Sequence, residues 1–162
     1  MKKLIVTALA VAALVGIGAL LLTGKQSAPQ TTFITLAGQK LPLESLRGKV
    51  VMVNFWATSC PGCIKEMPEL VNTYRKYHER GLETVAVAMS YDTPAYVKQF
   101  TERSGLPFTV ALDADGSAAQ AFGNVRLTPT TFVIDKQGHI VQQILGEPDF
   151  AKLHALLEQE LG

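Results

Sequence analysis

The sequence predicts an α/β domain, with a central mixed β-sheet flanked by helices, which follows an apolar N-terminal segment. Strand-like and helix-like patterns alternate through the middle of the chain, and a hairpin and one more helix complete it. The 162 residues, 48% of them apolar, are enough for one globular domain with a short appendage. The formal net charge is +1 and no basic stripe occurs, so nucleic acid is not expected as a partner.

The N-terminal segment carries no charged residue from position 4 to position 22. At about 1.5 Å per residue, a helix of this length spans about 28 Å, which is close to the hydrocarbon thickness of a bilayer. The best small residue for signal cleavage, Ala28, is followed at once by Pro29. We therefore expect residues 1–24 to be an uncleaved membrane anchor rather than a removed signal segment.

The same segment predicts orientation and domain organisation. Lys2 and Lys3 precede the apolar run, and the positive-inside tendency keeps them cytoplasmic and sends the domain outward. We expect a single-pass protein of the bacterial cytoplasmic membrane, with its domain in the periplasm or extracytoplasmic space. Residues 25–32 are polar and are predicted as a linker, and residues 33–162 as the folded domain.

Hydrophobic patterning predicts the elements in the first half of the domain. A helix should end at Gly81, and Pro68 should bend it because proline has no amide proton for the helical hydrogen bonds. Val85, Val87 and Met89 share one face of the strand that follows. The predicted elements are a hairpin of residues 33–36 and 40–43, a strand over 50–55, a helix over about 60–80 and a strand over 82–89.

Turn and capping residues predict the second half. Asp92 followed by Pro94 is a helix-start signal, and Asp135 to Gly138 has the composition of a hairpin turn. Apolar residues at helical spacing predict an amphipathic helix at the end of the chain. The predicted elements are a helix ending near residue 105, a strand over 108–112, a short helix over 117–122, a hairpin of residues 130–134 and 139–145, and a helix over 149–161.

The only two cysteines, Cys60 and Cys63, lie where a predicted strand gives way to a helix. This spacing in a βαβ context is typical of a redox-active dithiol that alternates with a disulfide. A purely structural disulfide is disfavoured, because closing so short a ring contributes only about 2 kcal/mol, against nearly 5 for a loop of about a hundred residues. A zinc site is also disfavoured, since the three histidines show no ligand spacing.

The two cysteines have different expected roles. Cys60 at the helix start would have its thiolate stabilised by free backbone amides and the helix dipole, which makes it the nucleophile. Cys63, within the first turn, would resolve the mixed disulfide. Pro61 and Gly62 would start the helix tightly and leave Cys60 uncovered for a protein substrate, although both also fit ordinary helix-start chemistry.

Two further residues have alternative interpretations. Glu66 lies three positions after Cys63 on the same helical face, so its carboxylate can exchange a proton with the resolving thiol. Its alternative is a solvated surface charge. Trp56, the only tryptophan, is either a core aromatic residue or a cover for one side of the sulfur site that contacts the substrate.

Three motifs surround these residues: VNFWAT at positions 53–58, EMP at 66–68 and TPTTFVID at 128–135. With them, the chain resembles the extracytoplasmic TlpA and ResA group of thiol:disulfide oxidoreductases in the thioredoxin superfamily, over about residues 33–161. The resemblance implies a thioredoxin-like fold with an N-terminal β-hairpin and an αβ insert. It also implies a proton-transfer role for Glu66, where the ResA subgroup has a glutamate.

The resemblance further implies a cis proline at Pro129, beside the disulfide. The backbone of Thr128 would then be free to pair with an extended substrate segment, and the alternative is an ordinary strand-edge proline. The chain departs from the group at Ser59 and Gly62, where aromatic and bulkier residues are common. Asn54 also replaces the buried aspartate of cytoplasmic thioredoxins.

These observations predict a membrane-anchored oxidoreductase that needs no cofactor and mainly reduces protein disulfides outside the cytoplasm, as part of redox homeostasis. The resemblance suggests apocytochrome c, copper-site assembly proteins and methionine sulfoxide reductases as partners, with a membrane or periplasmic electron donor. A non-catalytic copper(I) carrier that uses Cys60 and Cys63 is the alternative. A peroxiredoxin-like peroxidase is disfavoured because its Pro-x-x-x-Thr-x-x-Cys pattern is absent.

Overall fold

The computed structural model describes residues 26–162, so the predicted anchor at residues 1–24 lies outside the described residues. Within residues 26–162, no helix combines the length and the apolar character that crossing a membrane requires. Seven strands form one sheet in the order β2-β1-β5-β4-β3-β6-β7. They are β1 (Thr32–Thr35), β2 (Lys40–Pro42), β3 (Val50–Trp56), β4 (Leu82–Ala88), β5 (Thr109–Leu112), β6 (Thr130–Ile134) and β7 (Ile140–Leu145).

The sheet is mixed, as predicted. Strands β3, β4 and β5 run parallel to one another, whereas β6 and β7 on one side and β1 and β2 on the other are joined by antiparallel pairing. Val53 is paired with Val85 of β4 and with Phe132 of β6, which places β3 between these two strands in the interior of the sheet. The N-terminal hairpin is confirmed, and it adds to the edge of β5.

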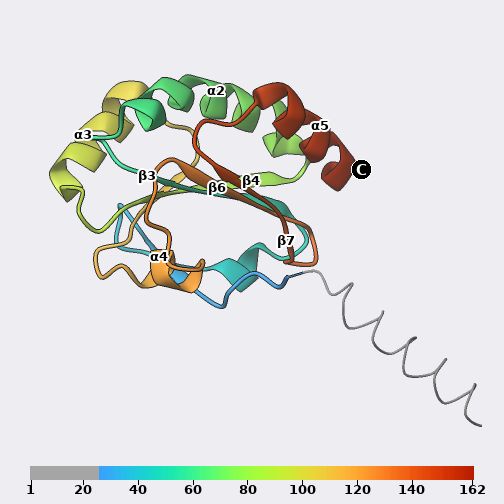
Figure 1. Ribbon diagram of the computed structural model, residues 1–162, viewed down its shortest axis with the longest axis horizontal. Helices are drawn as coiled ribbons and strands as arrows, with labels where there is room; N and C mark the ends of the chain where they lie inside the picture. Colours follow the sequence, from blue (N-terminus) through green and yellow to red (C-terminus); the bar gives the residue numbers. More distant parts are fainter. Residues whose placement is uncertain (1–25) are drawn as a thin grey trace, which may run out of the picture.

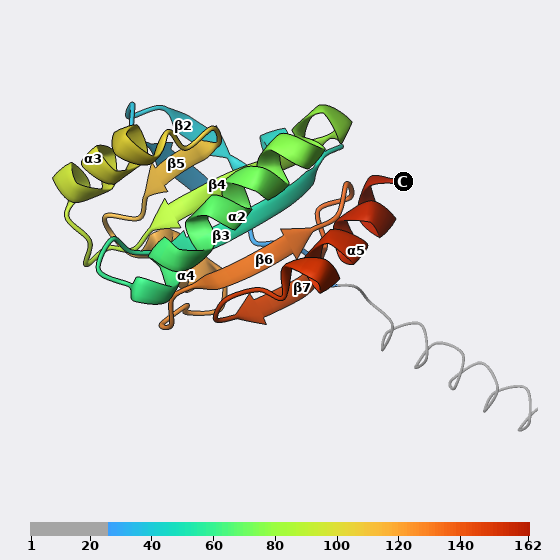
Figure 2. The ribbon, with the colours of Figure 1, turned by 90° about the horizontal axis from the view of Figure 1, so that it is seen from above.

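Helices cover both faces of the sheet (Figures 1 and 2). Three of them, α2 (Pro61–Tyr77), α3 (Pro94–Ser104) and α5 (Phe150–Leu161), lie on one face, and the short α4 (Ser117–Ala121) lies on the other. The buried residues accordingly form two hydrophobic clusters, one against each face. All seven residues of β3 are buried, as expected of a strand with neighbours on both sides and helices on both faces.

The long helix after the cysteines differs from its predicted range only at its ends. Cys60 is the N-cap residue, Pro61 is the first helical residue, and the α-helix ends at Tyr77. One 3-10 turn (His78–Arg80) follows, and Gly81 closes it with a φ of 101°, in the left-handed region that glycine tolerates. Pro68 lies inside the helix on its exposed side.

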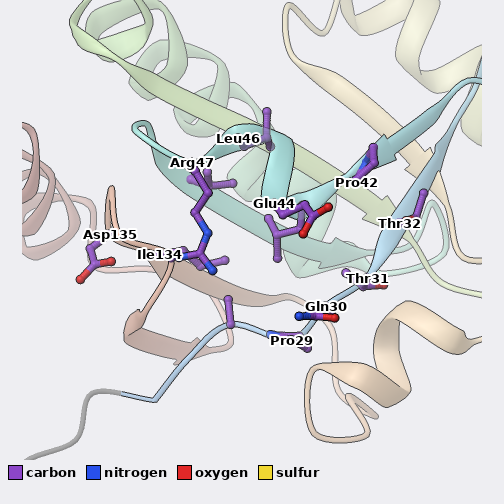
Figure 3. A pocket seen from close by; sticks show the side chains of 14 residues that line it. Pro29, Gln30, Thr31, Thr32, Pro42, Glu44, Leu46, Arg47, Ile134 and Asp135 are labelled. Carbon is purple, nitrogen blue, oxygen red and sulfur yellow. The ribbon is translucent and has the colours of Figure 1, made fainter.

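The described part of the predicted linker pairs with the domain through its backbone. The Ile140 N–H donates to the Gln26 carbonyl at 2.7 Å, and the Ala28 N–H donates to the Gly138 carbonyl at 2.9 Å. Figure 3 shows the segment from Pro29 to Thr32 along one side of a cavity of about 290 Å³. The cavity lies on the sheet face opposite α2, since its walls include Val51 and Ile134 from the cluster on that face.

Candidate active site

Cys60 and Cys63 form a disulfide at the start of α2, a few residues after the interior strand β3. Their Cα atoms are 5.3 Å apart. Cys60 is partly exposed, whereas Cys63 is fully buried. The arrangement fits the predicted division of roles, because only the Cys60 sulfur is open to another protein.

Cys60 also occupies the position that best stabilises a thiolate. As the N-cap residue of α2, it has an extended backbone, and its sulfur accepts a hydrogen bond from the Cys63 N–H at 3.2 Å. The first N–H groups of a helix have no internal partners, and the helix dipole adds partial positive charge there. Both effects favour the ionised form of the Cys60 sulfur once the disulfide is reduced.

The residues between the cysteines lie close to the loop before β6. Pro61 is exposed and begins the helix, and a Cβ atom on Gly62 would lie 3.6 Å from Pro129 Cδ and 3.5 Å from Glu147 Oε1. The Thr128-Pro129 peptide bond is cis, as the resemblance implied. Gly62 and Pro129 are therefore neighbours in space, which places the cis proline beside the disulfide as the resemblance implied.

Thr128 has free backbone groups next to this site. Within residues 26–162, neither the N–H nor the C=O of Thr128 has a hydrogen-bond partner, and the residue is only partly buried. Pro129, in contrast, is buried, and its carbonyl accepts from the Gly146 N–H at 2.8 Å. The segment thus offers the free N–H and C=O of one residue beside a carbonyl that is already paired.

Glu66 is buried, with 2% of its surface exposed, so the alternative of a solvated surface charge is wrong. The Asn54 side-chain amide donates to Glu66 Oε1 at 2.9 Å and to the Thr131 hydroxyl at 3.0 Å. Burial raises the pKa of Glu66 to about 7, the hydrogen bond from Asn54 opposes this shift, and the charge of Glu147 adds to it. The second carboxyl oxygen, Oε2, has no partner among the described residues.

Trp56 is completely buried, which corrects its predicted contact with substrate. It lies in the same hydrophobic cluster as Cys63, and its ring centroid is 5.3 Å from that of Phe100. The side chain therefore supports the dithiol from behind. The core interpretation of Trp56 is the right one.

The loop that follows β4 contributes two site contacts that the sequence did not indicate. Asp92 accepts hydrogen bonds from the Thr58 N–H at 2.5 Å and from the Thr58 hydroxyl at 2.6 Å, and so holds the turn before Cys60. The hydroxyl of Tyr91 lies 3.3 Å from that of Thr128. Topology could have indicated both residues, because β3 and β4 are parallel and their carboxyl ends meet at one edge of the sheet.

An ion pair that the sequence did not indicate lies at the rim of the site. Lys65 Nζ lies 2.7 Å from Glu147 Oε2, which links the second turn of α2 to the loop before α5. Both side chains are well exposed, so the pair contributes little to stability. No sequence pattern pointed to Glu147, because it stands in a loop far along the chain.

Comparisons with known sequences agree with this geometry. The model of the Redoxin family matches residues 23–157. Thiol-disulfide oxidoreductase ResA of Bacillus thuringiensis (strain Al Hakam) is 40% identical over 136 residues, which cover 84% of this chain and 77% of the Bacillus protein. ResA of Bacillus subtilis (strain 168) is 34% identical over 127 residues, 78% of this chain and 70% of that protein.

Solved structures show the same architecture. A thiol:disulfide interchange protein of the thioredoxin family from Chlorobium tepidum TLS superposes with a TM-score of 0.78 at 29% identity, covering 86% of this chain and 99% of that one. The solution structure of a Neisseria meningitidis protein assigned to the thioredoxins also gives 0.78, at 39% identity, over 85% of this chain and 91% of the other.

Proposed function

We propose that this chain, which belongs to the Redoxin family and is a thiol-disulfide oxidoreductase related to ResA, acts mainly as a reductant of protein disulfides outside the cytoplasm. The observation that carries the proposal is the asymmetry of the dithiol. One sulfur is partly exposed at a helix N-cap, and the other is buried behind it. This asymmetry suits an attacking thiolate and a resolving thiol.

The reaction follows from this placement. The Cys60 thiolate attacks one sulfur of a substrate disulfide, forms a mixed disulfide, and releases the other substrate sulfur as a thiolate. Cys63 then loses its proton and attacks the Cys60 sulfur, which releases the second substrate thiol. Two electrons have passed to the substrate, and the protein ends with the Cys60-Cys63 disulfide.

Glu66 is the proton acceptor that we assign to the second step. It lies one helical turn after Cys63 on the buried side of α2, and its pKa of about 7 allows it to hold or release a proton near neutral pH. Asn54 and Thr131 fix this network from the sheet. The reverse transfer, from Glu66 to Cys63, accompanies reduction of the protein by its electron donor.

The proposal also covers the cellular location of the protein and its partners. The uncharged run at residues 4–22 supports a membrane anchor, and the lysines before it support an extracytoplasmic domain. In that oxidising compartment, a reductant needs a dithiol donor in the membrane or the periplasm. Proteins that must receive haem or copper on reduced cysteines are suitable substrates.

The direction of exchange is tested by the midpoint potential of the Cys60/Cys63 couple. The full-length chain, in mild detergent, is equilibrated with dithiol buffers of graded potential, and the oxidised fraction is read from thiol alkylation. We expect a value near the −270 mV typical of thioredoxin, whereas a value near the roughly −120 mV of DsbA would indicate an oxidant.

The order of attack is tested by trapping. Reduced Cys63→Ser protein should accumulate a mixed disulfide through Cys60 with a disulfide-bonded peptide, detected by mass spectrometry without reductant. The matched Cys60→Ser protein should form none, because Cys63 is buried. An adduct through Cys63 in the Cys60→Ser protein, at a comparable rate, would reverse the assigned roles.

A further inference from the structure

The loop before α5 brings a carboxylate against the start of the dithiol helix. A Cβ atom on Gly62 would lie 3.5 Å from Glu147 Oε1, so Glu147 packs against the residue that precedes Cys63. A side chain larger than that of alanine at position 62 would need the space that this carboxylate occupies. The glycine, which stands where bulkier residues are common in the TlpA and ResA group, therefore admits a negative charge to the site.

Glu147 is fixed in this place from several sides. The Gly146 N–H donates to the Pro129 carbonyl at 2.8 Å, which ties the loop to the segment before β6. Pro148 is buried, and a proline restricts the backbone of the residue before it. The Glu147 carboxylate itself is paired with Lys65, whose Nζ lies 2.7 Å from Oε2. The charge of Glu147 thus has a defined position beside α2.

This position lies next to Glu66. Residues four apart in a helix are neighbours on one face, so Glu66 lies one turn after Gly62, on the side of α2 that Glu147 approaches. Burial is the main cause of the raised pKa of Glu66, and the charge of Glu147 adds to the increase. Lys65 bears the opposite charge, so it offsets part of the effect of Glu147.

The other groups that face Glu66 are neutral. From the sheet, the Asn54 amide of β3 donates to Oε1 and to the Thr131 hydroxyl of β6. On α2 itself, Cys63 is uncharged within the disulfide. The second carboxyl oxygen of Glu66 has no hydrogen-bond partner among the described residues, so no donor there counters the repulsion from Glu147.

We propose that the Glu147–Lys65 ion pair sets the pH at which Glu66 takes up or releases the proton of Cys63. Glu147 is a positioning residue in this proposal, because it acts on the reaction through Glu66. A negative charge beside Glu66 favours its protonated form, and Lys65 limits this effect. The inference rests on the proposed function, in which Glu66 accepts the proton of Cys63 during the resolving step.

Breaking the pair from its two sides should move the ionisation of Glu66 in opposite directions. Glu147→Gln removes the negative charge and keeps Lys65, so Glu66 should ionise at a lower pH than in the parent. Lys65→Gln leaves Glu147 without its counterion, so Glu66 should ionise at a higher pH. Each midpoint should shift by about half a pH unit, the size expected for one exposed charge near a titrating group. The double variant should lie between the two single variants.

The ionisation of Glu66 is measured directly by carbon-13 NMR. The oxidised full-length chain, labelled at the side-chain carboxyl carbons of glutamate, is titrated in mild detergent. The Glu66 signal is identified by its absence from the spectrum of Glu66→Gln. Raising the salt concentration to about 1 M should reduce the differences between the variants, because dissolved ions screen exposed charges.

The pH profile of mixed-disulfide decay provides a second measurement. At about pH 6, Glu147→Gln should raise the decay rate about two- to threefold, because more of Glu66 is ionised, and Lys65→Gln should lower it by a similar factor. Glu158→Gln is the matched control. It breaks an exposed ion pair of the same length, 2.7 Å to Arg80, beyond the other end of α2, and should move neither measurement.

Three results would overturn the proposal: no shift of the Glu66 midpoint in either single variant, shifts in the same direction in both, or an equal shift in Glu158→Gln. Shifts in the same direction would mean that the substitutions disturb the start of α2 rather than the local charge. If the NMR midpoints move as expected and the decay profile does not follow them, the ion pair controls Glu66, but Glu66 does not accept the proton of Cys63. That result contradicts the proposed function alone.

Discussion

The carboxyl group of Glu66 lies in a site that favours its neutral form up to about pH 7. It is removed from water, and one of its oxygens accepts a hydrogen bond from Asn54 while the other has no partner among the described residues. Desolvation disfavours the charged form, and a single neutral donor compensates for only part of that cost. The result is a buried acid whose proton can leave and return at neutral pH.

Glu66→Gln tests this role at the level of one reaction step. In the parent, the fraction of ionised Glu66 rises through about pH 7, so the rate at which Cys63 resolves the mixed disulfide should rise over the same range. Loss of the acceptor should slow that step about ten- to hundredfold at pH 7 and leave only the rise from thiol ionisation at higher pH. Stopped-flow measurement of mixed-disulfide decay between about pH 5.5 and 8.5 gives the profile.

Glu69→Gln is the control for this measurement, since Glu69 lies on the same helix but is exposed. It should leave the rate and the profile unchanged. If Glu66→Gln also behaves like the parent, the proton of Cys63 goes directly to solvent, and Glu66 serves only the packing of the helix against the sheet.

Sequence reasoning found the reacting residues but not the surroundings of Glu66. The helical spacing gave Cys60, Cys63 and Glu66, and the same spacing contained a further signal, because Cys63, Glu66, Met67 and Leu70 form the buried stripe of α2. A glutamate in an apolar stripe is expected to be buried. Its partner Asn54 could not be predicted, since that contact depends on how α2 packs across β3.

At the scale of helices and strands, the loops that follow the parallel strands meet at one edge of the sheet, where the carboxyl ends of these strands lie. Cys60 follows β3, Asp92 follows β4, and Asp113 follows β5. Each aspartate holds a neighbouring segment: Asp92 binds the turn before Cys60, and Asp113 accepts from the Ala118 and Ala119 N–H groups at 2.9 Å each. One edge of the sheet therefore organises both the dithiol turn and the start of α4.

Asp113→Ala should lower the stability of the fold without slowing disulfide reduction. The substitution leaves two buried N–H groups of α4 unpaired, and we expect a loss of about 1–3 kcal/mol in the free energy of unfolding. Urea denaturation of the oxidised protein measures this loss. The rate of disulfide reduction should stay within about twofold of the parent, because α4 lies on the sheet face opposite α2.

Asp115→Ala is the matched control, since Asp115 is exposed and its carboxylate accepts from the Ser117 N–H at the surface of the same turn. Its effect on stability should be smaller than that of Asp113→Ala. Equal effects of the two substitutions would mean that the buried hydrogen bonds at the start of α4 are replaced by water at little cost.

Element types were predictable here, whereas some boundaries and contacts were not. Glycine signals predicted the end of the 3-10 turn after α2 and the end of α3, because both ends depend on local backbone preferences, seen in the left-handed Gly81 and Gly105. The pairing of residues 26–28 with residues 138–140 could not be predicted from the polar composition of that segment. Such pairing depends on tertiary position and leaves no trace in a short polar segment.

At the scale of the whole molecule, the sheet separates two hydrophobic clusters. Alternate residues of β3 point to opposite faces, so Met52 and Trp56 join the cluster under α2, and Val53 and Phe55 join the cluster near α4. The dithiol helix rests on the first cluster, into which Cys63 is packed. Glu66 is also buried between α2 and the sheet. Its ionisation therefore changes the free energy of unfolding of the entire fold.

The free energy of unfolding should consequently fall as pH rises from about 4.5 to about 7. Over that range the folded protein keeps the Glu66 proton and the unfolded chain has released it, so the folded state binds more protons and stability decreases with pH. A pKa raised from 4.5 to about 7 corresponds to a loss of about 3 kcal/mol, complete above pH 7. Urea denaturation of the oxidised parent at pH values across this range measures it.

Glu66→Gln isolates the effect from other titrating groups. Burial lowers the pKa of His154, so this residue stabilises the fold increasingly as pH rises to its unfolded value, a trend opposite to that of Glu66. The glutamine variant keeps the pH dependence that comes from His154 and loses the one that comes from Glu66. The difference in the free energy of unfolding between parent and variant should therefore shrink or reverse sign as pH falls from 7 to 5. Parallel stability curves over that interval would mean that Glu66 ionises at its ordinary pKa, and the proton-transfer role near neutral pH would then lose its physical basis.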